Sequence, residues 1–403
     1  MLDKFPKSLF TLKWLAIALI VGTLAGLSSA LFLISLDWVT KFREEHLYLI
    51  YLLPIAGVAI AAMYHYFGQD VAKGNNQLIE EVEDPQNTIP LKMAPFVLIG
   101  TLVTHLFGGS AGREGTAVQM GGSLADQLST FVKFSKANRR ILIITGISGG
   151  FAAVFGTPLA ATVFALEVLV IGQLRYDALV PALLSALIAY WVCNLIPWVH
   201  HTHYFIGDIP PFSPITLLWA ILAGVAFGLI SLAFSEGMHF TTNLLGKLPH
   251  PLLKPLIGGG VVVLFFVAFK DTRPLGLGIP TIVNAFSTPQ VFWLFAAKLL
   301  LTVITLSSGF KGGEVTPLFF IGATLGSFLS IFLPLPVGLL AGMGFVAVFA
   351  GAANTPIACI LMGIELFGAK AGIYLAIAVI IAYLFSGHKG IYHAQKVGVN
   401  TVG

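Results

Sequence analysis

Two glutamates, Glu114 and Glu314, are the residues best suited to do chemistry in this sequence. Each stands at the start of an apolar segment and directly follows a glycine-rich run, GGSAGR before the first and SSGFKGG before the second. Glycines let the backbone turn and pack closely before a helix begins. The first N–H groups of a helix are unpaired and carry partial positive charge. We therefore expect two carboxylates beside donors that could also bind an anion.

A third glycine-containing junction, KGNNQLIEE at 73–81, has the same character. Several helix N-termini aimed at one point can bind an anion without a full positive charge, which allows rapid release. A glutamate at a helix start ordinarily only complements the helix dipole. Within a membrane, however, acidic residues are energetically unfavourable and are ordinarily functional. A carboxylate competes with an anion for the same donors until it is protonated, which would link anion movement to proton movement.

The composition indicates what must position these residues. Of the 403 residues, 57% are hydrophobic and only 10% are charged, whereas a soluble domain carries about 25% charged residues. Lipid must therefore be the solvent for much of the chain, and an all-α membrane protein is expected. Apolar stretches long enough to span a bilayer cover 11–39, 47–68, 141–172, 179–199, 216–235, 252–269, 335–367 and 371–386.

Shorter apolar stretches predict discontinuous helices that meet near the midplane of the membrane. They cover 94–107, 115–132, 291–306 and 316–333. The first long stretch reads as a retained span and not as a cleaved signal peptide. Basic residues before it and in the loop 133–140 predict a cytoplasmic N-terminus, and they account for the net charge of +4 without nucleic-acid binding: Lys4, Lys7, Lys13, Lys133, Lys136, Arg139 and Arg140. Cys193 and Cys359 lie in apolar runs, so no disulfide framework is expected.

The chain also resembles itself at a spacing of about 200 residues. FAAVFGTPLAATVFALE at 151–167 aligns with FAGAANTPIACILMGIE at 349–365, and GREGTAVQMGG aligns with GGEVTPLFFIG. We predict a first membrane repeat at 1–200, a linker at 201–214 and a second repeat at 215–403. In transporters built from repeats, the binding site lies at the repeat interface. Two matching small-residue pairs predict close helix packing: Gly22 with Gly26, and Gly224 with Gly228.

Other polar residues have ordinary structural explanations. Arg113 could attract anions or pair with Glu114, and Glu167 and Glu365 match across the repeats and more often pair structurally. The histidines around the start of the linker, at 200, 201 and 203, have metal-like spacing but no carboxylate or cysteine partner, so no metal site is expected. Tyr392 follows the last span, where tyrosine is usually an interfacial residue.

These motifs together resemble the CLC family of chloride channels and transporters. Gly112-Arg113-Glu114-Gly115-Thr116 is similar to the family signature GREGP, and GGEVTP at 312–317 is similar to GGIFAP. The segment 151–167 looks like the family helix with an Asn-Ala-Pro turn, here Gly156-Thr157-Pro158. The resemblance covers almost the whole chain. It implies a fold of two inverted helical repeats with discontinuous helices, assembled as a homodimer with one pathway per subunit.

The departures from the chloride-transporting pattern resemble the fluoride-exporting branch of the family. Asn75 stands where a serine is usual, Glu314 where isoleucine is usual, and Thr116 where proline is usual. Val168 stands where chloride/proton exchangers have an internal glutamate. An amide offers two N–H donors to a strongly hydrated anion, where a serine offers one O–H.

The resemblance implies specific roles. Glu114 would be the gating glutamate and Glu314 a central, proton-coupling glutamate. Asn75 and Tyr392 would donate to the anion from opposite sides. The backbone around Gly115, Val315 and Thr316, with the hydroxyls of Thr316 and Thr116, would complete the site.

Three functions are therefore compared. The first is fluoride/proton antiport across a prokaryotic plasma membrane, with fluoride, protons, lipid and a second copy of the chain as partners, no nucleic acid and no cofactor. The second is a chloride channel or chloride/proton exchanger of the same family. The third is an intramembrane enzyme, for which the chain offers no HExxH sequence and no serine–histidine constellation. The residues favour the first function.

Overall fold

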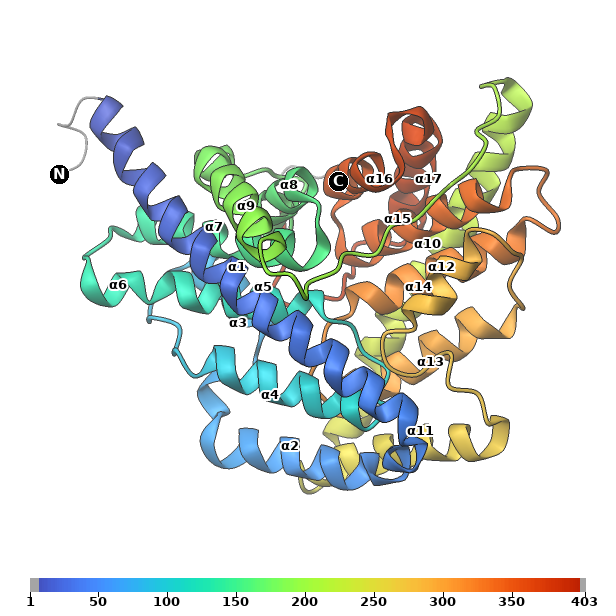
Figure 1. The fold of residues 1–403 in the computed structure, drawn as a ribbon, viewed down its shortest axis with the longest axis horizontal. Helices are drawn as coiled ribbons and strands as arrows, with labels where there is room; N and C mark the ends of the chain where they lie inside the picture. Colours follow the sequence, from blue (N-terminus) through green and yellow to red (C-terminus); the bar gives the residue numbers. More distant parts are fainter. Residues whose placement is uncertain (1–6, 399–403) are drawn as a thin grey trace.

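Helices form almost all of the regular structure of residues 7–398, which are the residues that the computed structural model describes (Figure 1). The first half of the chain contains these elements: α1 (Lys7–Glu45), η2 (Leu47–Leu52), α2 (Leu53–Phe67), η3 (Gln69–Val71), α3 (Asn75–Glu83), α4 (Met93–Leu106), α5 (Glu114–Asp126), α6 (Leu128–Phe131), α7 (Lys136–Phe155), α8 (Pro158–Glu167), β1 (Val170–Ile171), η4 (Tyr176–Ala178) and α9 (Leu179–Asn194). Lys4, one of the basic residues that predict a cytoplasmic N-terminus, lies outside the described residues.

The α-helices of the second half follow in the same order as those of the first and have similar lengths, except that the short α6 has no counterpart. Its elements are α10 (Pro214–Gly246), α11 (Leu253–Phe269), α12 (Ile279–Ala285), α13 (Trp293–Ser307), α14 (Val315–Leu329), α15 (Val337–Ala353), α16 (Pro356–Phe367), η5 (Ala369–Ala371), α17 (Gly372–Phe385) and β2 (Lys396–Val397). The long helices α1 and α10 correspond, as do the short α3 and α12 and the paired α8 and α16. This order supports the predicted division at 201–214, whose boundaries remain a prediction.

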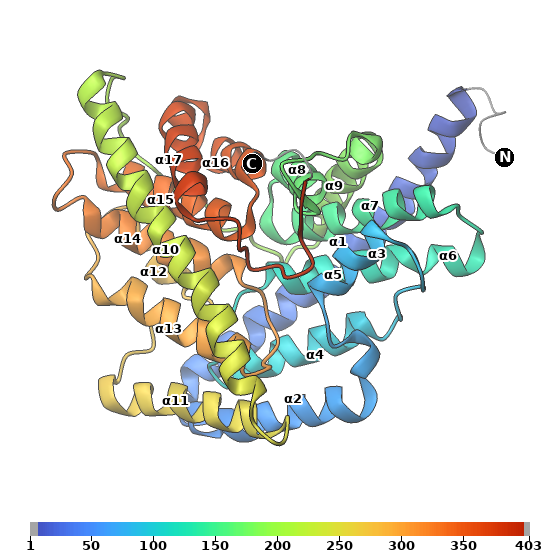
Figure 2. The same cartoon turned by 180° about the vertical axis from the view of Figure 1, so that it is seen from behind.

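The long helices of the two halves lie on opposite faces of the molecule. In Figure 1, α1 crosses the front, whereas in Figure 2, seen from behind, α10 crosses the front. A rotation axis perpendicular to these views would leave both helices on one face, so the axis that relates the halves is not perpendicular to them.

The matching glycine pairs pack the long helix of each half, as predicted. A Cβ atom on Gly22 would lie 2.9 Å from the Ile188 side chain, so α1 contacts α9 at close range. A Cβ atom on Gly224 would lie 2.8 Å from the Ile381 side chain, so α10 contacts α17 in the same way. The absence of a side chain at these positions lets the helices approach closely.

Two of the predicted spans are wrong as single helices. The stretch 141–172 is divided into α7 and α8, and 335–367 is divided into α15 and α16. At each break a left-handed residue ends the first helix, Gly156 with φ 83° or Asn354 with φ 55°. A proline at the first position then begins the next helix. An average over hydropathy misses such a break because both flanking segments are apolar.

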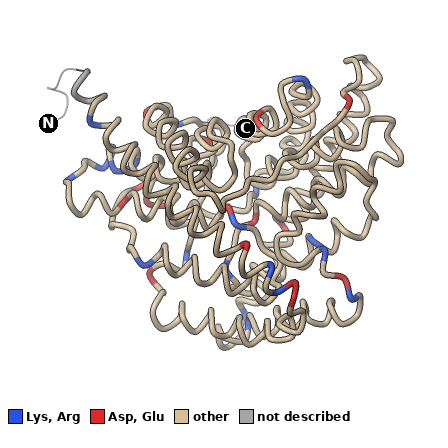
Figure 3. Tube along the Cα trace, in the orientation of Figure 1, with Lys and Arg blue, Asp and Glu red and all other residues tan. Residues whose placement is uncertain are grey.

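Few helices could cross a bilayer on their own. Of the described residues, four segments are long and apolar enough: Leu12–Glu45, Leu47–Phe67, Tyr176–Asn194 and Pro214–Gly246. The predicted spans 252–269 and 371–386 are single helices, but they have only 17 and 14 residues. Many helices therefore end inside the molecule, and their ends need partners there. Charged residues are sparse along the trace (Figure 3).

Candidate functional site

The two glycine-rich loops singled out in the sequence meet in the middle of the molecule. Gly112 and Gly313 pair as an antiparallel bridge, with Gly112 N donating to Gly313 O at 2.6 Å and Gly313 N donating to Gly112 O at 2.8 Å. Immediately after the bridge, α5 begins at Glu114 and α14 begins at Val315. Two helix N-termini, one from each half, thus start beside one another.

The carboxylate of Glu114 lies at the start of α14. Thr316 N donates to Oε2 at 3.1 Å, and the Thr316 hydroxyl lies 2.8 Å from Oε1 and 2.6 Å from Oε2. Glu114 is only 1% exposed. Its own loop adds Arg113 N at 3.2 Å, and Arg113 Nε lies 3.6 Å from Oε1. The carboxylate therefore fills a place whose donors suit any small anion.

Glu314 comes from the other half and takes the N-cap position of α14 without a side-chain capping bond. Its Oε2 is buried and accepts no hydrogen bond. A Cβ atom on Gly115 would lie 3.7 Å from this oxygen. A buried, unpartnered carboxylate oxygen is energetically unfavourable, so protonation or a passing partner would stabilise it.

Asn75 reaches the same glycine from a third helix. Gly74, with φ 58°, ends the preceding loop, and α3 begins at Asn75. The Asn75 Nδ2 atom would lie 2.9 Å from a Cβ atom on Gly115, whereas Asn75 Oδ1 is buried without a partner. The amide of Asn75 and the carboxylate of Glu314 both lie within contact distance of the place that the side chain of a larger residue at position 115 would take.

Tyr392 is buried and meets Asn75 at a small cavity. The cavity has a volume of about 10 Å³, which is about the volume of one water-sized sphere. Its other lining residues are apolar: Leu78, Ile79, Val118, Ile147, Phe164 and Val168. Val168 stands where chloride/proton exchangers have an internal glutamate, and it lines the same cavity as the two proposed donors, Asn75 and Tyr392.

Val315 and Thr116, both predicted to complete the anion site, differ in their contacts. Val315 is the first residue of α14 and is buried beside the Glu114 carboxylate's donors. The hydroxyl of Thr116 instead lies 2.7 Å from the hydroxyl of Thr101 on α4. Sequence reasoning did not single out Thr101, since a threonine inside an apolar helix gives no signal until its partner is known.

Glu167 and Glu365 cap each other's helices. Glu167 accepts from Ile357 N and Ala358 N at the start of α16, at 3.0 and 2.8 Å. Glu365 accepts from Leu159 N and Ala160 N at the start of α8, at 2.9 and 2.7 Å. The structural interpretation is therefore right for both, because each carboxylate satisfies two otherwise unpaired N–H groups.

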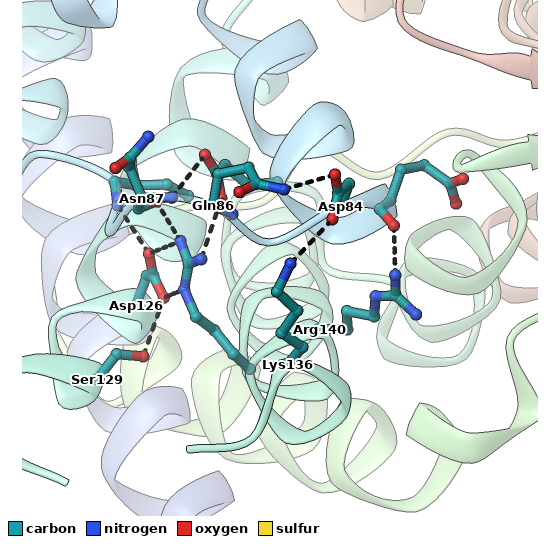
Figure 4. A network of polar contacts seen from close by, with 11 residues as sticks. Asp84, Gln86, Asn87, Asp126, Ser129, Lys136 and Arg140 are labelled. Carbon is teal, nitrogen blue, oxygen red and sulfur yellow. Dashed lines mark hydrogen bonds and ion pairs between the residues drawn. The ribbon is translucent and has the colours of Figure 1, made fainter. Parts of the chain in front are cut away.

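A charged network fixes the far ends of the helices that carry Asn75 and Glu114 (Figure 4). Arg139 of α7 donates to both oxygens of Asp126, at the end of α5, at 2.8 Å each. It also donates to Glu81 of α3 at 3.0 Å and to Asn87 O at 2.5 Å. One guanidinium thus sets α3 and α5 relative to each other. No group of three histidine, cysteine or acidic residues within 7–398 could hold a metal ion.

Comparisons with known proteins agree with this architecture. The profile of the voltage gated chloride channel family matches residues 56–387. A chloride/fluoride channel protein of Pseudomonas syringae pv. tomato is 50% identical over 98% of this chain and 88% of its own. An H(+)/Cl(-) exchange transporter of Vibrio vulnificus is 28% identical over 92% of this chain and 85% of its own.

A solved structure extends the comparison. The crystal structure of a CLC-type fluoride/proton antiporter has a TM-score of 0.93 and 37% identity, covering 96% of this chain and 99% of its own. The helices of the chain are thus arranged as two inverted repeats in a multi-pass membrane protein. With its glycine-rich loops, its interrupted helices and these matches, the chain belongs to the CLC family of chloride channels and transporters.

Proposed function

We propose that this protein exports fluoride in exchange for protons across the plasma membrane of a prokaryote. The observation that carries the proposal is the position of the Glu114 carboxylate, which takes the N–H and the hydroxyl of Thr316 at the start of α14. An anion that needs these donors must displace the carboxylate. Protonation weakens the carboxylate as an acceptor and frees the donors, so proton uptake and anion binding are linked.

Glu314 supplies the second titratable group of this proposal. Its unpartnered oxygen and the amide of Asn75 both lie close to Gly115. When neutral, a carboxylic acid can donate one hydrogen bond, so protonated Glu314 could add a donor for the anion. The deprotonated form would repel the anion and release it. Glu314 thereby replaces the internal glutamate that is absent at Val168.

The donor set favours fluoride over chloride. Fluoride is strongly hydrated, and a site must replace many water hydrogen bonds. Asn75 offers an amide, Thr316 offers an N–H and a hydroxyl, and Tyr392 offers a phenol. The relative named a chloride/fluoride channel protein and the fluoride/proton antiporter both support this choice. Gly115, Val315 and Thr116 complete the proposed site, the first by leaving room and the second through its backbone N–H.

The proposal includes a homodimer with one pathway in each subunit and no cofactor. It is tested by reconstituting the purified protein into liposomes loaded with fluoride or chloride. Electrodes for each anion and for pH record efflux and proton uptake together. We expect fluoride efflux to drive proton movement in the opposite direction, and chloride efflux to be much slower. If chloride leaves as fast as fluoride, the chloride alternative is right.

Glu114→Gln tests the coupling. The amide keeps the size of the side chain but cannot exchange a proton at this position. We expect fluoride-driven proton movement to fall to the level of protein-free liposomes. Proton movement that persists at the wild-type ratio to fluoride would exclude Glu114 as the coupling residue.

A further inference from the structure

The segment after α17 runs back across the face seen in Figure 2, and it contains Tyr392, which is buried. We call residues 387–398 the C-terminal strap. Its backbone is tied at two points near Tyr392: Ile391 N donates to Ala352 O at 2.9 Å, and Ala394 N donates to Asn76 Oδ1 at 3.0 Å. Asn76 directly follows Asn75. The strap thus carries Tyr392 and is bonded to the residue next to Asn75, and these two proposed donors line the same cavity.

A tight turn fixes Tyr392 within the strap. Gln395 N donates to Tyr392 O at 3.1 Å, which closes the four residues from Tyr392 to Gln395. Because this turn is short, the orientation of Tyr392 depends on where Gln395 is held.

The side chain of Gln395 is held by two helix ends. Its Nε2 donates to Val168 O and to Ala353 O, both at 2.9 Å. Its Oε1 accepts from Asn354 Nδ2 at 3.2 Å. The two carbonyls belong to the ends of α8 and α15, where carbonyl groups lack helical partners. One amide thus joins one helix end from each half of the molecule to the turn that carries Tyr392.

We propose that Gln395 is a positioning residue that sets the distance between Tyr392 and Asn75 and thereby excludes anions larger than fluoride. The inference rests on the proposed function, in which these two side chains donate to the anion. Both residues line one small cavity, so a movement of the strap that carries Tyr392 would change the space that they leave. Fluoride is about as large as a water molecule and chloride is larger. A small outward movement of the strap would admit chloride and lengthen the hydrogen bonds to fluoride.

Gln395→Met tests this role, since it keeps the length of the side chain and removes both donors and the acceptor. We expect the ratio of chloride to fluoride efflux to rise about tenfold, the change that the loss of about one net hydrogen bond produces. The apparent KM for fluoride should rise while the maximal rate changes little. Asn76→Ala, which removes the acceptor for Ala394 N, should change the ratio in the same direction.

Lys389→Gln is the matched control on the strap. Lys389 Nζ lies 3.0 Å from Glu236, in a pair whose side chains are 69% and 47% exposed. We expect its efflux ratio to stay within about twofold of wild type, because exposed ion pairs contribute little. Thermal unfolding in detergent shows which variants are folded. If Gln395→Met does not fold, Asn76→Ala is used for the test in its place.

Two results would overturn the inference. In the first, the folded Gln395→Met and Asn76→Ala variants keep the wild-type ratio of chloride to fluoride. In the second, both fluxes fall by the same factor, as a purely structural defect would cause. A wild-type protein that does not prefer fluoride gives a third, distinguishable result, because it removes the proposed function and this inference together.

Discussion

At the residue scale, Thr316 decides how firmly Glu114 is held. Thr316→Val keeps the shape of the side chain and the backbone N–H but removes the hydroxyl that contacts both carboxylate oxygens. Hydrogen bonds to charged groups contribute about 1.5–3 kcal/mol. Since fluoride would use the same hydroxyl, we expect its apparent KM to rise about tenfold or more. Initial efflux rates over a range of fluoride concentrations measure this change.

Thr116→Val is the comparison for this prediction. The two threonines match across the repeats, but the Thr116 hydroxyl contacts Thr101 and not a glutamate in the described structure. We expect a smaller rise in KM than for Thr316→Val. Equal effects of the two variants would show that position in the motif, and not contact with Glu114, governs anion binding.

At the scale of elements, the reciprocal caps of α8 and α16 hold the two halves together. Glu167→Gln and Glu365→Gln keep an acceptor oxygen but lose the charge that complements each helix start. We expect each to lower the free energy of unfolding by about 1–2 kcal/mol, and fluoride/proton coupling to persist.

Thermal unfolding in detergent and the liposome assay check both parts of this prediction. The two caps lie at separate helix starts, so the double variant should show nearly additive destabilisation. Loss of coupling in a stable Glu167→Gln protein would contradict the structural role and would indicate a role in proton transfer.

The network around Arg139 should matter more for stability than any exposed pair. Arg139→Met leaves Asp126, whose side chain is fully buried, without its charged partner. Breaking a buried pair in this way costs about 3–5 kcal/mol. Lys136→Gln removes an exposed pair with Asp84, whose side chains are 64% and 65% exposed. That change should cost about 0–1 kcal/mol.

Unfolding temperatures of the two variants give the comparison directly. The double variant Arg139→Met with Asp126→Leu should recover part of the loss, because the fully buried charge of Asp126 is removed together with its partner. Similar unfolding temperatures for Arg139→Met and Lys136→Gln would mean that the network does not clamp α3 to α5.

At the scale of the whole molecule, the proposed homodimer should hold two independent pathways. Every proposed site residue comes from one chain, since the bridge of Gly112 and Gly313 joins loops of the same protomer. A linked dimer with one wild-type and one Glu114→Gln subunit should therefore retain about half of the fluoride-driven proton movement of the wild type. Complete loss in the linked dimer would indicate that the subunits cooperate in one pathway.

The sequence by itself determined that lipid surrounds much of the chain, that the chain contains an internal repeat, and which two acidic residues are candidates for the site. Composition alone requires lipid around the chain, and the repeated motifs place Glu114 and Glu314 at equivalent loops. These are local properties of residue type and spacing, which need no knowledge of distant contacts. The two predicted spans that are wrong, 141–172 and 335–367, failed because hydropathy is insensitive to a single left-handed residue followed by a proline.

Only the tertiary structure decided which donors face which acids. Glu114 meets Thr316, more than 200 positions away in the chain, and Gln395 reaches helix ends in both halves. Such pairs depend on how two inverted halves come together, and nothing in the local sequence of either partner encodes the distance between them. For the same reason the hydroxyl of Thr116, equivalent in sequence to that of Thr316, has a different partner.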